Sequence, residues 1–217
     1  MNINNILVPT DFSDNAMKAA KLAAKIATET NANIMLINGY VKPQGGTSVM
    51  VKITDLIAKE AKENMSDFLN SLKEEFPNVN FDGKTSYGYI DEVIQVITQD
   101  QPYDLIIMGT TGSDKIQNKV FGSNTSKMIQ KSAVPVLSVP SDFSGHELET
   151  MVLCVELPLK NKEVLHRFNA ISAALGVETK IISMPLKKSV ESLQDEIDSI
   201  KAETNIPVEI VRVKGKN

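Results

Sequence analysis

Short strand-like segments alternate along this 217-residue chain with longer segments that have helical periodicity. The strand-like segments cover residues 5–8, 34–37, 79–87, 104–108 and 134–139. Helical patterns follow Ser13 and occupy residues 49–76, 90–97 and 122–131. Helices between successive strands predict parallel strands joined by right-handed crossovers on both faces of one sheet. The alternation therefore predicts an α/β fold with a doubly wound, five-stranded parallel sheet.

The same pattern restarts beyond Pro140. Strand-like segments at 151–156, 179–183 and 208–213 alternate with helical patterns at 161–175 and 189–203. This β-α-β-α-β order repeats the first three strands of the preceding unit. We therefore expect a first domain at residues 1–140, a linker at 141–149 and a partial second domain at 150–217. The sequence leaves open whether the second domain is cut short or naturally incomplete.

Composition narrows the range of partners and compartments. The chain has 23 basic and 27 acidic residues, so its net charge of −4 gives no broad attraction to nucleic acid or anionic lipid. The sequence has no leader pattern and no apolar run of about 18 residues. A single cysteine, Cys154, excludes an intrachain disulfide and fits a reducing compartment. We expect a soluble cytoplasmic protein with neither nucleic acid nor membrane as a partner.

A glycine motif follows the fourth strand-like segment directly. Residues 108–126, MGTTGSDKIQNKVFGSNTS, contain the spacing Gly109-x2-Gly112-x9-Gly122, and Ser123 comes next. A glycine at the end of a strand lets a ligand approach the backbone, and a Gly-Ser pair that opens a helix presents amides and a hydroxyl to an anion. Phosphate is the ligand that this arrangement favours. Glycines between strand and helix also serve as turn residues and C-caps.

This spacing and an amino-terminal segment resemble the universal stress protein family. Its nucleotide-binding members carry Gly-x2-Gly-x9-Gly-Ser/Thr after their fourth strand. Residues 6–13, ILVPTDFS, match the family's first strand and the Pro-Thr-Asp-Phe-Ser turn after it. The resemblance implies the strand order 3-2-1-4-5 and a tandem repeat of the same unit beyond residue 140. In that order strands one and four are neighbours where the winding reverses, so the two motifs are expected to meet at one crevice.

The resemblance implies an adenine nucleotide, with ATP as the expected ligand and Mg²⁺ as its candidate metal. The glycines would give backbone approach to ribose and phosphates, while Ser123 and Thr125 donate hydroxyls. Asp11 is placed for ribose hydroxyls or, through water, for a divalent ion; its alternative role is a helix N-cap. The full predicted set is Pro9, Thr10, Asp11, Gly39, Met108, Gly109, Gly112, Gly122, Ser123, Asn124 and Thr125.

Several residues depart from the family pattern or leave alternatives open. Gly39 falls where members place an apolar residue against adenine, and Asn124 stands where an apolar or small residue is usual. Lys115 and Lys119 fit either phosphate contact or a solvated face. In the second half Glu156 replaces the equivalent of Asp11 and no Gly-x-x-Gly follows. We therefore expect one nucleotide site per chain.

The remaining reactive side chains suggest no further site. His146 and His166 have no partners at metal-ligand spacing and are expected to be solvated. Cys154 lies in an apolar segment without a nearby cation, so a buried, inert thiol is expected.

Three functions remain open from the sequence. The first is an ATP-binding regulatory module with at most slow, incidental hydrolysis. The second is a nucleotide-dependent transferase or ligase, and the third is a stress protein that dimerises without nucleotide. The first is favoured because the crevice offers little beyond Asp11 and two lysines to stabilise phosphoryl charge. Family members pair their fifth strand with a counterpart, so we expect a homodimer through residues 134–139, from Val134 to Val139.

Overall fold

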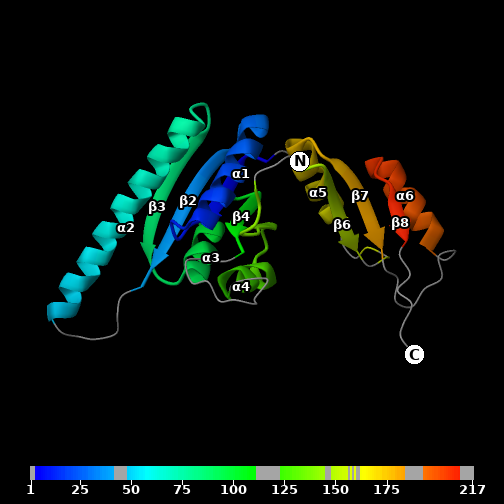
Figure 1. Cartoon of the computed structure of the whole chain (residues 1–217). Helices are drawn as coiled ribbons and strands as arrows, with labels where there is room; N and C mark the ends of the chain where they lie inside the picture. Colours follow the sequence, from blue (N-terminus) through cyan, green and yellow to red (C-terminus); the bar gives the residue numbers. More distant parts are fainter. Residues whose placement is uncertain are drawn as a thin grey trace. The chain divides into compact units, whose positions relative to one another are not determined.

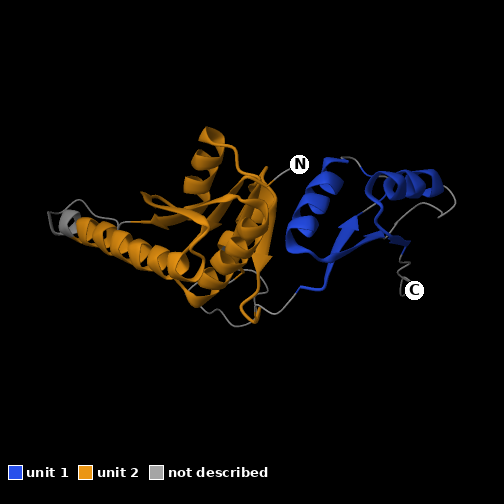
Figure 2. Cartoon of the chain, turned by 90° about the horizontal axis from the view of Figure 1, so that it is seen from above, with its two compact units in different colours: residues 1–2, 147–217 blue, residues 3–146 orange. Residues whose placement is uncertain are grey.

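The computed structural model of the chain describes residues 3–41, 48–110, 123–144, 148–155, 157, 159, 162–183 and 193–210, with the backbone alone at 48–52 and 123. The chain divides into two compact units, residues 3–146 and residues 147–217 with 1–2, which Figure 2 shows in two colours. Each unit has its own parallel sheet. Among the described residues, no helix combines the length and apolar character needed to cross a membrane.

The first unit is a doubly wound α/β sheet with the strand order β3-β2-β1-β4-β5, which confirms the predicted fold class and order. All four strand pairings are parallel. Its elements, labelled in Figure 1 where there is room, are β1 (Asn5–Pro9), α1 (Asp14–Thr30), β2 (Asn33–Tyr40), α2 (Ser48–Glu75), β3 (Asn80–Tyr87), α3 (Ile90–Asp100), β4 (Leu105–Gly109), α4 (Ser123–Lys131) and β5 (Val136–Val139).

The two faces of this sheet bury different sets of strand side chains. Helices α3 and α4 pack Val93, Ile94 and Met128 against one face, where Leu7 and Ile106 lie among the buried residues. Helices α1 and α2 contact the strands as well, and α1 does so through fully buried alanines such as Ala20. Neighbouring residues of a strand point to opposite faces, so a strand buried on both faces is apolar throughout. This accounts for the continuous apolar runs in β1 and β4.

Strand β5 begins two residues later than the sequence predicted. The hydroxyl of Ser132 accepts from the backbone N–H of Val134 at 3.0 Å and donates to the carbonyl of Val134 at 2.7 Å. Pro135 follows and has no N–H to donate. The predicted start at Val134 was therefore wrong, because a local turn uses the backbone groups of that residue.

The second unit is a three-stranded sheet in the order β6-β7-β8. Its core holds Leu165 and Phe168 of one helix, Ile197 and Ile200 of the other, and Ile181 of the sheet, together with further apolar side chains. Its elements are β6 (Thr150–Val155), α5 (Glu163–Leu175), β7 (Glu178–Ser183), α6 (Gln194–Thr204) and β8 (Val208–Ile210).

The second unit repeats the register of the first. Residue i pairs with residue i+28 both between β1 and β2 (Asn5 with Asn33) and between β6 and β7 (Thr150 with Glu178). The C-caps of α1 and α5, Asn31 and Gly176, are both left-handed, with φ of 57° and 64°. A shift of 145 residues, from 5 to 150 and from 31 to 176, relates both features. The two β-α-β segments are thus equivalent position by position.

The sheet of the second unit buries one face of β6. Exposure alternates along this strand: Met151, Leu153 and Val155 pack against the core, whereas Val152 is 44% exposed. Cys154 lies on the same face as Val152 and is exposed. The predicted buried thiol was therefore wrong, because an apolar sequence around Cys154 does not reveal which face of the strand is covered.

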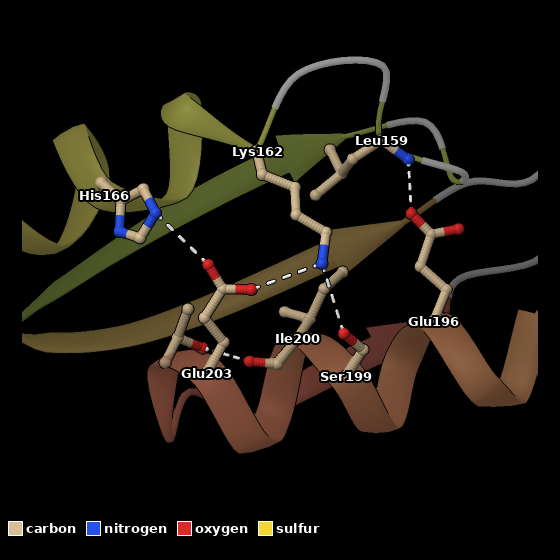
Figure 3. Close-up of polar contacts among 8 residues, drawn as sticks. Leu159, Lys162, His166, Glu196, Ser199, Ile200 and Glu203 are labelled. Carbon is tan, nitrogen blue, oxygen red and sulfur yellow. Dashed lines mark hydrogen bonds and ion pairs between the residues drawn. The ribbon is translucent and has the colours of Figure 1, made fainter.

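Polar contacts link α5 and the segment before it to α6 (Figure 3). Glu203 lies 3.4 Å from Lys162 Nζ and 3.3 Å from His166 Nε2, so one carboxylate faces two basic side chains. Lys162 Nζ also donates to Ser199 Oγ at 3.3 Å. The interpretation of His166 as an isolated residue is corrected: it is exposed, but it has a carboxylate partner on the next helix.

The alternation along β7 predicts unequal costs for two neighbouring substitutions. Ile181 is fully buried in the core of the second unit, and Ile182 is half-buried on the opposite face. We expect Ile181→Ala to lower the free energy of unfolding by about 2 to 5 kcal/mol and Ile182→Ala to lower it clearly less. Urea denaturation monitored by hydrogen exchange of the β7 amides measures both values. Equal losses would contradict the assignment of the two faces.

Candidate functional site

The carboxyl ends of β1 and β4 lie side by side in the middle of the first sheet. The two strands pair through Ile6 with Leu105 and Leu7 with Ile106. Each strand then runs into a threonine whose N–H extends the sheet bonding: Thr10 donates to the carbonyl of Ile37 and Thr110 to that of Val139, both at 2.9 Å. The described parts of the two sequence motifs therefore meet at one edge, where the winding of the sheet reverses.

The turn after β1 is fixed by its own side chains. Thr10 is buried, and its hydroxyl accepts from the N–H of Phe12 at 2.9 Å. Asp11 is exposed, and its Oδ1 accepts from the N–H of Ser13 at 3.1 Å. Ser13, not Asp11, is the N-cap of α1, since its Oγ accepts from Ala16 N at 3.2 Å. The carboxylate of Asp11 is thus exposed just after the end of β1, and one of its oxygens is bonded to the backbone of the turn.

Phe12 adopts an unusual backbone conformation within this turn. Its φ of 64° lies in the left-handed region, which costs a residue with a side chain about 1 to 2 kcal/mol. The ring of Phe12 packs edge-to-face against Phe68 of α2, with centroids 5.9 Å apart. Helix α2 therefore supports the turn that presents Asp11.

Gly109, at the end of β4, is enclosed by α1 and α4. A Cβ added to Gly109 would lie 2.6 Å from Nδ2 of Asn15, a buried side chain in the first turn of α1. The hydroxyl of Thr125 in α4 donates to the carbonyl of Gly109 at 2.9 Å. Thr125 is 2% exposed. In this structure its hydroxyl therefore anchors the strand end.

The other described residues of the predicted set occupy different environments. A Cβ on Gly39 would lie 2.9 Å from the carbonyl oxygen of Gly88, so the turn into α3 leaves no space for a side chain there. Met108 is 5% exposed and belongs to the core under α3 and α4. Asn124 is exposed. Pro9 ends β1 and is buried.

Part of the predicted set lies outside the described residues. Gly112 and Gly122 are in this group, and only the backbone of Ser123 is described. Lys115, Lys119 and His146, which are not part of the predicted set, also lie outside the described residues. The predicted nucleotide contacts of Gly112, Gly122 and Ser123 remain predictions, and the role of the two lysines stays open.

Two buried asparagines at this edge were missed from the sequence. Asn15 packs against Gly109, and Asn38, at 8% exposure, donates through Nδ2 to the carbonyl of Thr10 at 2.8 Å. Asn38 follows the apolar run 34–37 within β2, and Asn15 lies in the first turn of an alanine-rich helix. A polar side chain at such a position is a detectable signal, because burial of an amide requires hydrogen-bond partners.

The second unit lacks this arrangement at equivalent positions. The shift of 145 residues places Val155 at the position of Thr10 and Ser183 at that of Asn38. Ser183 is fully buried, and within the described residues its Oγ has no hydrogen-bond partner. A serine side chain is shorter than an asparagine side chain and does not make the bond that Asn38 makes to the first strand.

The anchoring role of Thr125 leads to a stability prediction. We expect Thr125→Val to lower the unfolding free energy of the first unit by about 1 kcal/mol, because the valine cannot donate to the Gly109 carbonyl. Thr125→Ser keeps the hydroxyl and should retain most of this stability. Chemical denaturation of the two variants tests the difference. If valine is tolerated better than serine, the hydrogen bond is not what holds the end of β4.

Comparison with known proteins places this geometry in a family. The model of the universal stress protein family matches residues 2–140. A universal stress protein of Methanocaldococcus jannaschii is 30% identical over a region that covers 62% of this chain and 80% of the relative. A solved universal stress protein from Archaeoglobus fulgidus DSM 4304 aligns with 99% of this chain and 78% of its own, with a TM-score of 0.67 and 19% identity.

A further solved universal stress protein was determined in complex with cAMP. It is 18% identical, with a TM-score of 0.51, and the match covers 64% of this chain and 98% of that one. These structural likenesses concern the fold. The family model spans more than half of the chain and includes both strand ends described above, and the chain therefore belongs to the universal stress protein family.

Proposed function

We propose that the first unit is a regulatory module that binds one adenine nucleotide, ATP in the first place, at the junction of β1 and β4. The observation that carries the proposal is the parallel pairing of these strands, which brings Thr10-Asp11 and Gly109-Thr110 to one edge. In open α/β sheets this reversal point is where ligands bind. Membership of the family supports the same location.

The residues around this edge suggest a division of roles. Backbone groups at Gly109 and at the start of α4 would meet the phosphates, since a helix amino terminus offers free amides to an anion. The exposed carboxylate of Asp11 would accept from ribose hydroxyls or bind a metal through water. Thr10, Asn15, Asn38 and Thr125 would position these groups, because their side chains contact neighbouring protein atoms.

A dedicated enzyme is less well supported by the same edge. Within the described residues, no group of three or more His, Cys, Asp and Glu side chains gathers as a metal site. Mg²⁺ would therefore be bound mainly by the nucleotide phosphates, and among those residues Asp11 would be its one protein contact. Fast phosphoryl transfer relies on several positioned cations around the phosphate, whereas the sequence offers this edge only Lys115 and Lys119 of the glycine loop, beside the carboxylate of Asp11.

Calorimetric titration with Mg-ATP is expected to show one site per chain. Asp11→Asn should weaken binding several-fold, because the carboxamide keeps the size of the side chain but loses its charge. Asp100→Asn is the matched control, since Asp100 is an exposed carboxylate at the end of α3, ahead of β4. Gly122→Val should abolish binding by filling phosphate space.

Two further outcomes of the titration discriminate between ligands and functions. Tighter binding of cAMP than of ATP would show that the preferred ligand is a different adenine nucleotide, while the proposed location of the site would stand. Unchanged ATP affinity in Gly122→Val would contradict the site itself. Phosphate release far below about 1 per second fits a regulatory module, whereas an Asp11-dependent rate between about 1 and 1000 per second would support the enzyme.

Pairing of two chains through β5 is the second part of the proposal. Strand β5 is an edge strand bonded to β4, and three of its four residues are only half-buried. An uncovered, apolar edge favours pairing with another strand.

We expect light scattering to give about twice the chain mass of 23.8 kDa, and Val136→Lys to give monomers. Val96→Lys, at an exposed apolar position of α3, is the control; a Val136→Lys dimer would exclude this interface.

A further inference from the structure

A cavity with both polar and apolar lining lies at the opposite edge of the first sheet, around the amino-terminal ends of β1 and β2. Its volume is about 340 Å³, which is at the small end of the range for ligand pockets. The side chains that matter for its chemistry are Asn5, Asn33, Met35, Asp82, Gln101 and Tyr103. None of them belongs to the predicted nucleotide site, which lies at the carboxyl ends of the strands.

One wall of the cavity is ordered by a ladder of three asparagines at the same register of β1, β2 and β3. Asn80 Nδ2 donates to Asn33 Oδ1 at 2.7 Å, and Asn33 Nδ2 donates to Asn5 Oδ1 at 3.5 Å. The ladder fixes how each carboxamide is turned. The NH₂ group of Asn5 and the second N–H of Asn33 are donors that the ladder does not use.

The facing wall is the segment that joins α3 to β4. Tyr103 is half-buried, and its hydroxyl donates to Gln101 Oε1 at 3.4 Å. Burial raises the pKa of Tyr103, so the phenol stays protonated at neutral pH. The carboxylate of Asp104 accepts from the N–H groups of Asn4 and Asn5 at 2.8 and 3.0 Å and ties this segment to β1. Both walls are therefore held by hydrogen bonds before any ligand binds.

The charges around the cavity select a neutral ligand. Among the described residues no Lys or Arg lines it, so an anion would find no cation there. Asp82 is the one carboxylate among the described lining residues, and Lys84 follows it on the same face of β3, which weakens the attraction for a cation. Carboxamides both donate and accept, as hydroxyl groups do. Met35 adds an apolar surface for the C–H groups of a ligand.

We propose that this cavity binds a small neutral polyhydroxylated molecule of the size of a monosaccharide, with Asp82 and the ladder asparagines bonded to its hydroxyls. The ligand lies against Met35 and Tyr103. The site is independent of the nucleotide site, because the two occupy opposite edges of the sheet.

Amide NMR spectra of the whole chain test the proposal with D-glucose, D-ribose and myo-inositol as probes at millimolar concentration. At least one probe should shift the amide resonances of Asn33, Asp82 and Tyr103. Asp82→Ala should remove the shifts, because it deletes the carboxylate from an exposed position that the fold does not need. Gln101→Ala should weaken them, and Lys84→Ala, two residues along the same strand, should preserve them.

The outcomes separate this site from its alternatives. Absence of shifts at these residues with all three probes would overturn the proposal, as would shifts that persist in Asp82→Ala. Shifts produced by putrescine but by no sugar would show that the cavity selects a cation and would also overturn it. The affinity for Mg-ATP should be the same in Asp82→Ala as in the unmodified chain. The titration with Mg-ATP therefore tests the nucleotide proposal independently of the sugar site.

Discussion

The parallel pairing of β1 with β4 joins segments that lie about one hundred residues apart, from Leu7 to Ile106. Pairing across such a distance is possible because β1, β2 and β3 run outward in one direction before the chain returns to the other side of β1. The return places α3 and α4 on the face that α1 and α2 do not cover. It also brings both ends of β4 beside β1. At the carboxyl edge of the sheet, the backbone of Gly109 and Thr110 lies beside the turn at Thr10. At the amino edge, residues 101–103 lie beside Asn5.

The second unit illustrates a sheet in which, among the described residues, no strand is added on the other side of the first one. Its β-α-β segment reproduces the first unit in register and in the left-handed C-cap of the first helix. Its three described strands run in the order 6-7-8, so the winding does not reverse among them. A sheet wound in one direction has no reversal point at which two loops separate to admit a ligand. The replacement of Asn38 by Ser183 and of Thr10 by Val155 is then consistent with a unit that has no crevice to maintain among its described residues.

Local residue patterns predicted the elements of the first unit, but its strand order depended on the family resemblance. Alternating strands and helices limit the topologies without choosing one. Features that depend on tertiary contact could not be predicted from the chain alone. The exposed side of Cys154 is set by which face the helices cover, and the start of β5 is set by the hydroxyl of Ser132. Glycine at position 39 looked like a loss of nucleotide contact, whereas the structure shows a steric limit imposed by Gly88.

Phe12 couples two parts of the first unit that are usually considered separately. Its left-handed backbone costs about 1 to 2 kcal/mol, and an edge-to-face aromatic pair contributes about 0.5 to 1.5 kcal/mol, which is of similar size. The partner ring belongs to α2, the longest helix of the unit. A contact with α2 therefore helps to hold the turn that carries Asp11. A substitution of Phe68 in α2 would remove a contact that stabilises the turn before α1, although Phe68 lies far from Asp11 in the sequence.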